Sequence, residues 1–79
     1  MRHARDQDLD RLEDLLVRLR ALPGLVEKKR GVFYRRSRAF LHFHEDPKGL
    51  FADIGDDRFD VTEEPGRLAL LRAVAERLA

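Results

Sequence analysis

The chain has 79 residues, of which 43% are apolar and 39% charged, and its formal net charge is +1. The absence of cysteine excludes disulfides, thiolate nucleophiles and cysteine metal sites. No signal-peptide pattern is present, and no apolar stretch reaches the roughly 20 residues needed to cross a bilayer. We therefore expect residues 1–79 to form one small cytoplasmic domain that does not enter membranes, with residues 1–7 frayed.

Charge is distributed unevenly along the chain. Residues 28–38 carry six basic side chains and no acid, whereas residues 45–64 carry eight acids and two bases. Opposite charges of this kind either neutralise each other on neighbouring strands or attract a second copy of the chain. The sequence leaves both outcomes open.

The first predicted element is an amphipathic helix over residues 8–22. Asp6 or Asp8 can cap its start, and Pro23-Gly24 ends it. Apolar side chains recur at steps of three and four, which places them on one face. They are Leu9, Leu12, Leu15, Leu16, Leu19 and Leu22.

After this helix the apolar period changes to two, which predicts four short strands. Turn residues at 36–38, 46–49 and 55–57 have hairpin lengths, so the strands should form an antiparallel meander. One face of the meander is apolar and should meet the helices. It carries Val32, Tyr34, Leu41, Phe43, Ala52, Ile54, Phe59 and Val61.

A second helix is predicted near the end of the chain. Thr62 can cap it, and Glu63, Glu64 and Pro65 are typical of a first turn. Its apolar stripe follows from Gly66 onward: Leu68, Leu71, Ala75 and Leu78, with Val74 beside them. The predicted fold is an α+β two-layer sandwich in the order α-ββββ-α, a four-stranded antiparallel meander with both helices on one face.

The opposite, uncovered face of the sheet predicts the leading function, a noncatalytic interaction module. A loop at 46–49 sets His44 opposite Phe51 and His42 opposite Asp53. Aromatic side chains on an uncovered face favour association with a second copy or another partner, so a homodimer is expected. The expected interaction residues are Phe33, Phe40, His42, His44, Phe51 and Asp53.

A divalent-metal site is one alternative at the same place. Alternate positions put His42 and His44 on one side of a strand, and Asp53 could add an oxygen ligand. His3 is expected in the frayed terminus and is not assigned to the site. Because Ser37 is the only serine and Thr62 the only threonine, covalent catalysis is not expected. No cofactor is expected.

A nucleic-acid-binding module is the other alternative. The basic hairpin over 28–38 contains aromatic rings, so it could contact phosphates while a ring stacks on a base. An arginine-rich strand that resists aggregation is the competing interpretation. The residues concerned are Lys28, Lys29, Arg30, Tyr34, Arg35, Arg36 and Arg38.

Residues 22–54 resemble small bacterial proteins and, more distantly, the YjbR/MmcQ-like group. Leu22-Pro23-Gly24 and Glu27 match the helix exit of that group, and Ala39-Phe40 matches the opening of a strand. The resemblance implies a two-layer α+β domain and a DNA-binding role suggested by fold comparison. It implies no catalytic residues.

Overall fold

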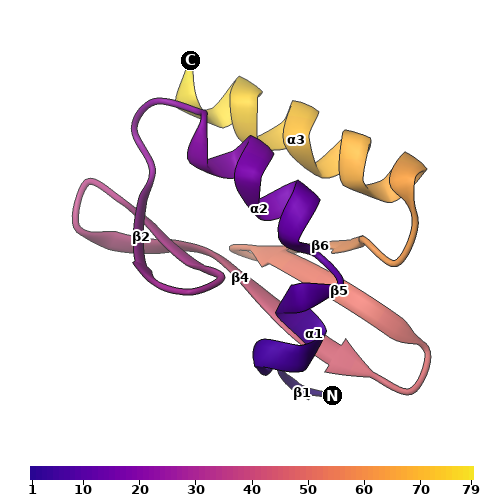
Figure 1. The fold of residues 1–79 in the computed structure, drawn as a ribbon. Coiled ribbons are helices and arrows are strands. Elements are labelled where there is room, and N and C mark those ends of the chain that lie inside the picture. Colours follow the sequence, from indigo (N-terminus) through magenta and orange to yellow (C-terminus); the bar gives the residue numbers. More distant parts are fainter.

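The computed structural model describes residues 1–79 as an α+β fold with an antiparallel sheet (Figure 1). The sheet has six strands where four were predicted, and there are three helices where two were predicted. The elements in chain order are β1 (Arg2–His3), α1 (Asp6–Asp10), α2 (Glu13–Arg20), β2 (Val26–Lys29), β3 (Val32–Arg35), β4 (Arg38–Asp46), β5 (Gly49–Ile54), β6 (Asp57–Asp60) and α3 (Glu64–Leu78).

Strand β4 is the centre of the sheet. The main path runs β2-β3-β4-β5-β6, and every pairing is antiparallel. One edge of β4 pairs with β5 from Leu41 to Asp46. The other edge is shared, because β3 pairs with its first part through Leu41 and β1 pairs with its last part through His44 and Glu45. The chain's first strand and its third strand are therefore separated by a short stretch of β4.

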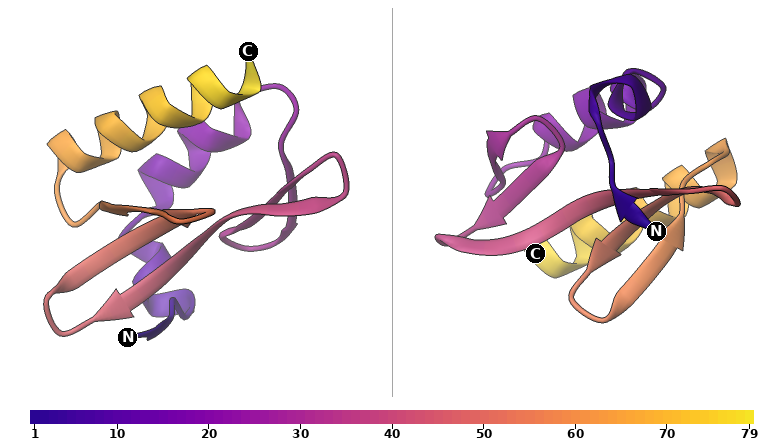
Figure 2. Two further views of the ribbon diagram at one scale, coloured as in Figure 1. Left: turned by 180° about the vertical axis from the view of Figure 1, so that it is seen from behind. Right: turned by 90° about the horizontal axis from the view of Figure 1, so that it is seen from below.

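The core joins all three helices to the sheet. Figures 1 and 2 show α2 and α3 side by side against the strands, and Arg18 of α2 donates two hydrogen bonds of 3.0 Å to Glu64 at the start of α3. Fourteen buried residues form one apolar cluster. They are Leu9, Leu12, Leu15, Leu16, Leu19, Phe33, Leu41, Phe43, Leu50, Ala52, Ile54, Val61, Leu70 and Val74.

The predicted first helix is broken into α1 and α2. The N–H of Leu12 bonds to the carbonyl of Leu9 at 2.9 Å, which is a tight turn and not a continuing α-helix. Helix α1 begins two residues earlier than predicted, and the Asp8 carboxylate accepts the N–H of Arg5 at 2.9 Å. The break changes the chain direction while leaving the leucines on both sides of it buried.

Two predictions about the last helix are wrong in detail. Leu68 is 51% exposed, and the helix buries Leu70 and Val74. Thr62 does not cap the helix, whose N-cap residue is Glu63. The Thr62 hydroxyl instead accepts the N–H of Leu50 at 3.0 Å, so it extends the hydrogen bonding of β5.

Strand β3 faces the opposite way from the prediction. Phe33, expected on the uncovered face, is 1% exposed and pairs with the core residue Leu41. Val32 and Tyr34, expected to meet the helices, are half-buried. The register shifts between Phe33 and Tyr34, and such an irregularity changes which side chains share a face.

Candidate histidine site

The β4–β5 hairpin positions the first part of the site. Its register confirms the predicted pairs: His42 lies opposite Asp53, and His44 lies opposite Phe51. His44 Nε2 is 3.0 Å from Asp53 Oδ2, and His42 Nε2 is 3.8 Å from the same oxygen. The three residues each offer a ligand atom, and these atoms lie within 4.8 Å of one another.

Strand β6 supplies a partner for the carboxylate. Arg58 lies opposite Asp53 and donates from Nε to Oδ1 at 2.7 Å and from Nη2 to Oδ2 at 2.9 Å. This two-point hydrogen bond holds the pKa of Asp53 below its ordinary value, against the opposing effect of burial. Asp53 is only 8% exposed, and the two hydrogen bonds from Arg58 compensate its charge.

His3 joins this site, although residues 1–7 were expected to be frayed. Strand β1 pairs His3 with His44, and the N–H of Ala4 continues the pairing by donating to the carbonyl of Phe43 at 3.0 Å. The His3 ring stacks on that of His44 at a centroid distance of 5.0 Å and is 6.0 Å from that of His42. All three histidines of the chain therefore converge; with Asp53 they are called the histidine cluster below.

Burial lowers the pKa of the His42 imidazole, and it is the largest of the influences on this group. The neighbouring His44 lowers the pKa further, whereas the carboxylate of Asp53 raises it. The His42 and His44 rings meet edge to face at 4.8 Å. The neutral form, which has a free ring lone pair, is thus favoured at His42.

The predicted interaction face is less aromatic than expected. Phe33 is in the core, and Phe40 is half-buried and packs against the core cluster. Phe51 is half-buried and lies between His44 and Asp60 in the strand pairing. The polar histidine cluster is therefore the main feature of this part of the sheet.

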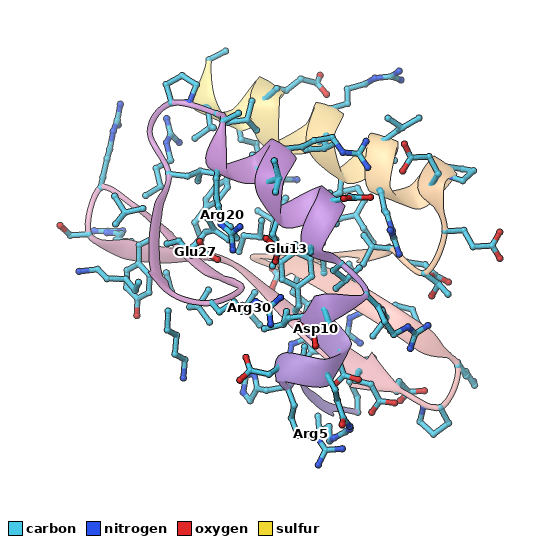
Figure 3. The ribbon with its side chains drawn as sticks, in the orientation of Figure 1. Arg5, Asp10, Glu13, Arg20, Glu27 and Arg30 are labelled. Atoms are coloured by element: carbon cyan, nitrogen blue, oxygen red, sulfur yellow. The ribbon has the colours of Figure 1, made fainter.

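The basic segment 28–38 divides into a neutralised part and an unpaired part. Arg30 contacts Asp10 at 2.8 Å and Glu13 at 2.9 Å, so its partners come from the first two helices and not from the acidic strands (Figure 3). Lys28 lies over the Tyr34 ring, 5.5 Å from its centre. The remaining arginines of the segment form no ion pair with any acid. They are Arg35, Arg36 and Arg38.

These three residues form what is called the arginine turn below. Arg36 and Ser37 have φ angles of 52° and 68°, which give the tight two-residue connection between β3 and β4. A hollow of about 470 Å³ is lined by the three arginines together with Ala39 and Phe40. Positive charge is therefore concentrated at this end of β4.

Comparisons with protein-family models, with curated proteins and with solved structures found no match. The resemblance to the YjbR/MmcQ-like group stays a prediction. None of the three helices is both long enough and apolar enough to cross a membrane.

Proposed function

We propose that the protein binds a divalent transition-metal ion through the histidine cluster. The observation that carries this proposal is the convergence of all three histidines of the chain, two of which contact one buried carboxylate, Asp53. Imidazole and carboxylate ligands suit zinc and similar ions, which take four such ligands at about 2.0–2.2 Å. The ligands would be His42, His44 and Asp53, with His3 as the fourth.

The existing contacts favour this ligand set. The Nε2 atoms of His42 and His44 lie 3.8 Å and 3.0 Å from the same oxygen of Asp53, so an ion placed between these three atoms would need small side-chain shifts. Arg58 holds Asp53 through both oxygens and would act as the outer partner that orients the carboxylate. His3 is exposed and can turn toward the ion without loss of core packing.

The placement of the helices is part of the proposal. We propose that the helices cover the face of the sheet opposite the histidine cluster. The core cluster supports this, because it unites Leu41, Phe43, Ala52 and Ile54 with helix side chains, while the alternating His42 and His44 remain partly exposed. The cluster would then be reachable from solvent.

Zinc titration of untagged protein, followed by native mass spectrometry and calorimetry, tests the proposal. One equivalent should bind, and His44→Ala should weaken binding by more than about tenfold, since loss of even an outer partner commonly costs that much. Asp53→Asn should also weaken it, whereas Asp56→Asn, in the exposed β5–β6 turn, is the matched control and should not. The proposal would be overturned if the wild-type protein bound no zinc, or if His44→Ala bound zinc as tightly as the wild-type protein.

The same mass spectra test the expected homodimer. With Phe33 buried and Phe40 packed against the core, association would depend mainly on Phe51 and the histidines. If the wild-type protein is a dimer and Phe51→Asp is a monomer, this interface is established. If the wild-type protein is a monomer at high concentration, the expected homodimer is rejected.

A second candidate function, nucleic-acid binding, is favoured by the arginine turn. Its three guanidinium groups have no acidic partner, so they remain available to phosphates. Anisotropy measurements with a single-stranded oligonucleotide should show affinity that falls with salt. The double variant Arg35→Ala/Arg36→Ala should reduce the salt slope by about 1.4, because each phosphate contact on a single strand contributes about 0.7.

The matched control for this experiment removes two arginines elsewhere. Arg11 and Arg72 are exposed and form no ion pair, so Arg11→Ala/Arg72→Ala changes the net charge equally. An equal loss of affinity in both double variants would show nonspecific attraction and reject the arginine turn as the binding element.

A further inference from the structure

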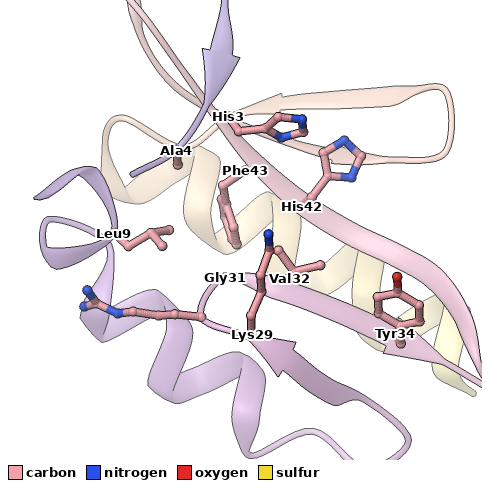
Figure 4. A pocket seen from close by; sticks show the side chains of 10 residues that line it. His3, Ala4, Leu9, Lys29, Gly31, Val32, Tyr34, His42 and Phe43 are labelled. Carbon is pink, nitrogen blue, oxygen red and sulfur yellow. The ribbon is translucent and has the colours of Figure 1, made fainter. Parts of the chain in front are cut away.

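A cavity lies beside the histidine cluster, in the gap that β1 and β3 leave along the edge of β4 (Figure 4). Its volume is about 370 Å³, which falls in the range of small-molecule sites. His3 and Ala4 line it from the β1 side, and Val32 and Tyr34 from β3. The two elements that bound the cavity are therefore far apart in sequence and meet only through β4.

The inner wall of the cavity is apolar. Leu9 and Phe43 are 4% and 3% exposed, and both belong to the core cluster. Gly31 permits this arrangement, since its φ is +79° and a side chain there would lie 2.8 Å from Leu9. Val32 adds a further apolar contact. An apolar group of a ligand would therefore rest on rigid core side chains.

The polar side chains at the rim are mostly hydrogen-bond donors, and none is an acid. Lys29 forms no ion pair, and Figure 4 shows its amino group directed toward the space beside Val32 and Phe43. The Tyr34 hydroxyl and the His42 imidazole lie on the same side of the cavity. Arg30 also lines it, but its charge is neutralised by the acids of α1 and α2. The cavity thus combines an apolar floor with an uncompensated cation.

We propose that this cavity binds a small organic carboxylate, with its apolar body on Leu9, Val32 and Phe43 and its carboxylate on Lys29. A charge-assisted hydrogen bond from Lys29 would fix the anion, and Tyr34 would donate a second one. The proposal goes beyond metal binding and does not rest on it. His3 and His42 belong to the histidine cluster and also line the cavity, but Lys29 and Tyr34 lie outside the cluster, and His44 does not line the cavity.

Benzoate is the probe, and methyl and aromatic NMR signals of the metal-free wild-type protein are the readout. Benzoate should shift signals of Leu9, Val32 and Phe43 with a dissociation constant on the order of millimolar. Neutral benzamide should shift them much less. Equal shifts with benzamide, or none with benzoate, would overturn the proposal.

Variants separate this site from the metal site. Lys29→Gln should weaken benzoate binding by roughly tenfold or more, since hydrogen bonds to charged groups are strong, while zinc binding stays unchanged. The matched control is Lys48→Gln, in the β4–β5 turn, which should bind benzoate normally. Tyr34→Phe, which removes one hydroxyl, provides a second variant that should bind less tightly. Unchanged benzoate binding in both Lys29→Gln and Tyr34→Phe would reject the assigned contacts.

His44→Ala gives the converse result. It should bind zinc more weakly, by more than about tenfold, and keep its affinity for benzoate, because it changes the histidine cluster and leaves the cavity lining intact. If the wild-type protein binds benzoate but no zinc, the metal proposal alone is rejected. If it binds zinc but no benzoate, the carboxylate site alone is rejected.

Discussion

The histidine cluster and the arginine turn lie toward opposite ends of one strand, β4. Charged groups are paired at the histidine cluster and unpaired at the arginine turn. At the histidine end, Asp53 comes from β5 and Arg58 from β6, and the polar groups bond to one another. At the turn, neither neighbouring strand brings an acid to Arg36 or Arg38. The number of charges in a segment therefore does not predict how many remain unpaired, because the acids on the neighbouring helices and strands decide this.

The largest effect expected from this difference is on stability. Asp53→Ala should lower the free energy of unfolding by about 0.5–1.5 kcal/mol, because Arg58 loses both of its hydrogen bonds to this largely buried carboxylate. Arg36→Ala, at the other end of β4, should change it by less than about 0.5 kcal/mol. Urea denaturation of metal-free protein measures both. Similar losses in the two variants would show that the compensated and unpaired ends are energetically alike.

A smaller effect is expected at Glu27, which directly precedes the basic segment. Glu27 accepts Arg20 Nε at 2.6 Å and the N–H of Gly31 at 2.9 Å, and the pKa of Glu27 is lowered, first by Arg20 (Figure 3). A lowered folded-state pKa gives stability that is present above the unfolded pKa of about 4.5. This stability is lost as the pH falls through the folded-state pKa.

Thermal unfolding at several pH values should therefore show a weaker acid dependence in Glu27→Gln than in the wild-type protein. Glu76→Gln is the matched control, since Glu76 is exposed on α3 and forms no ion pair. If the wild-type protein and Glu27→Gln lose thermal stability equally as the pH falls, the contact with Arg20 makes no measurable contribution to stability.

The sequence was sufficient for the β4–β5 hairpin and for the pairing at the histidine cluster. Residues 41–44 alternate between core and polar side chains, and the turn at 46–49 has a defined length, so the opposite partners of His42 and His44 could be predicted. The core leucines of the first helix followed in the same way from their spacing.

Other parts of the site carry no such pattern. Residues 32–35 offer three adjacent bulky side chains, so alternation cannot tell which of Phe33 and Tyr34 faces the core. Strand β1 has two residues, too few for any period, and its pairing with β4 depends on tertiary contacts. The position of His3 was therefore missed, and the only sequence signal that could have pointed to it was that it is the third histidine of the chain.

The brevity of β1 couples ligand binding to backbone order. Two residues of pairing and the Ala4 hydrogen bond hold His3 in place, and such short segments open at low cost. Any ion that engages His3 must shift this opening equilibrium toward the paired state. Amide hydrogen exchange at Ala4 would then slow on zinc addition, which makes the first few residues a built-in reporter of occupancy.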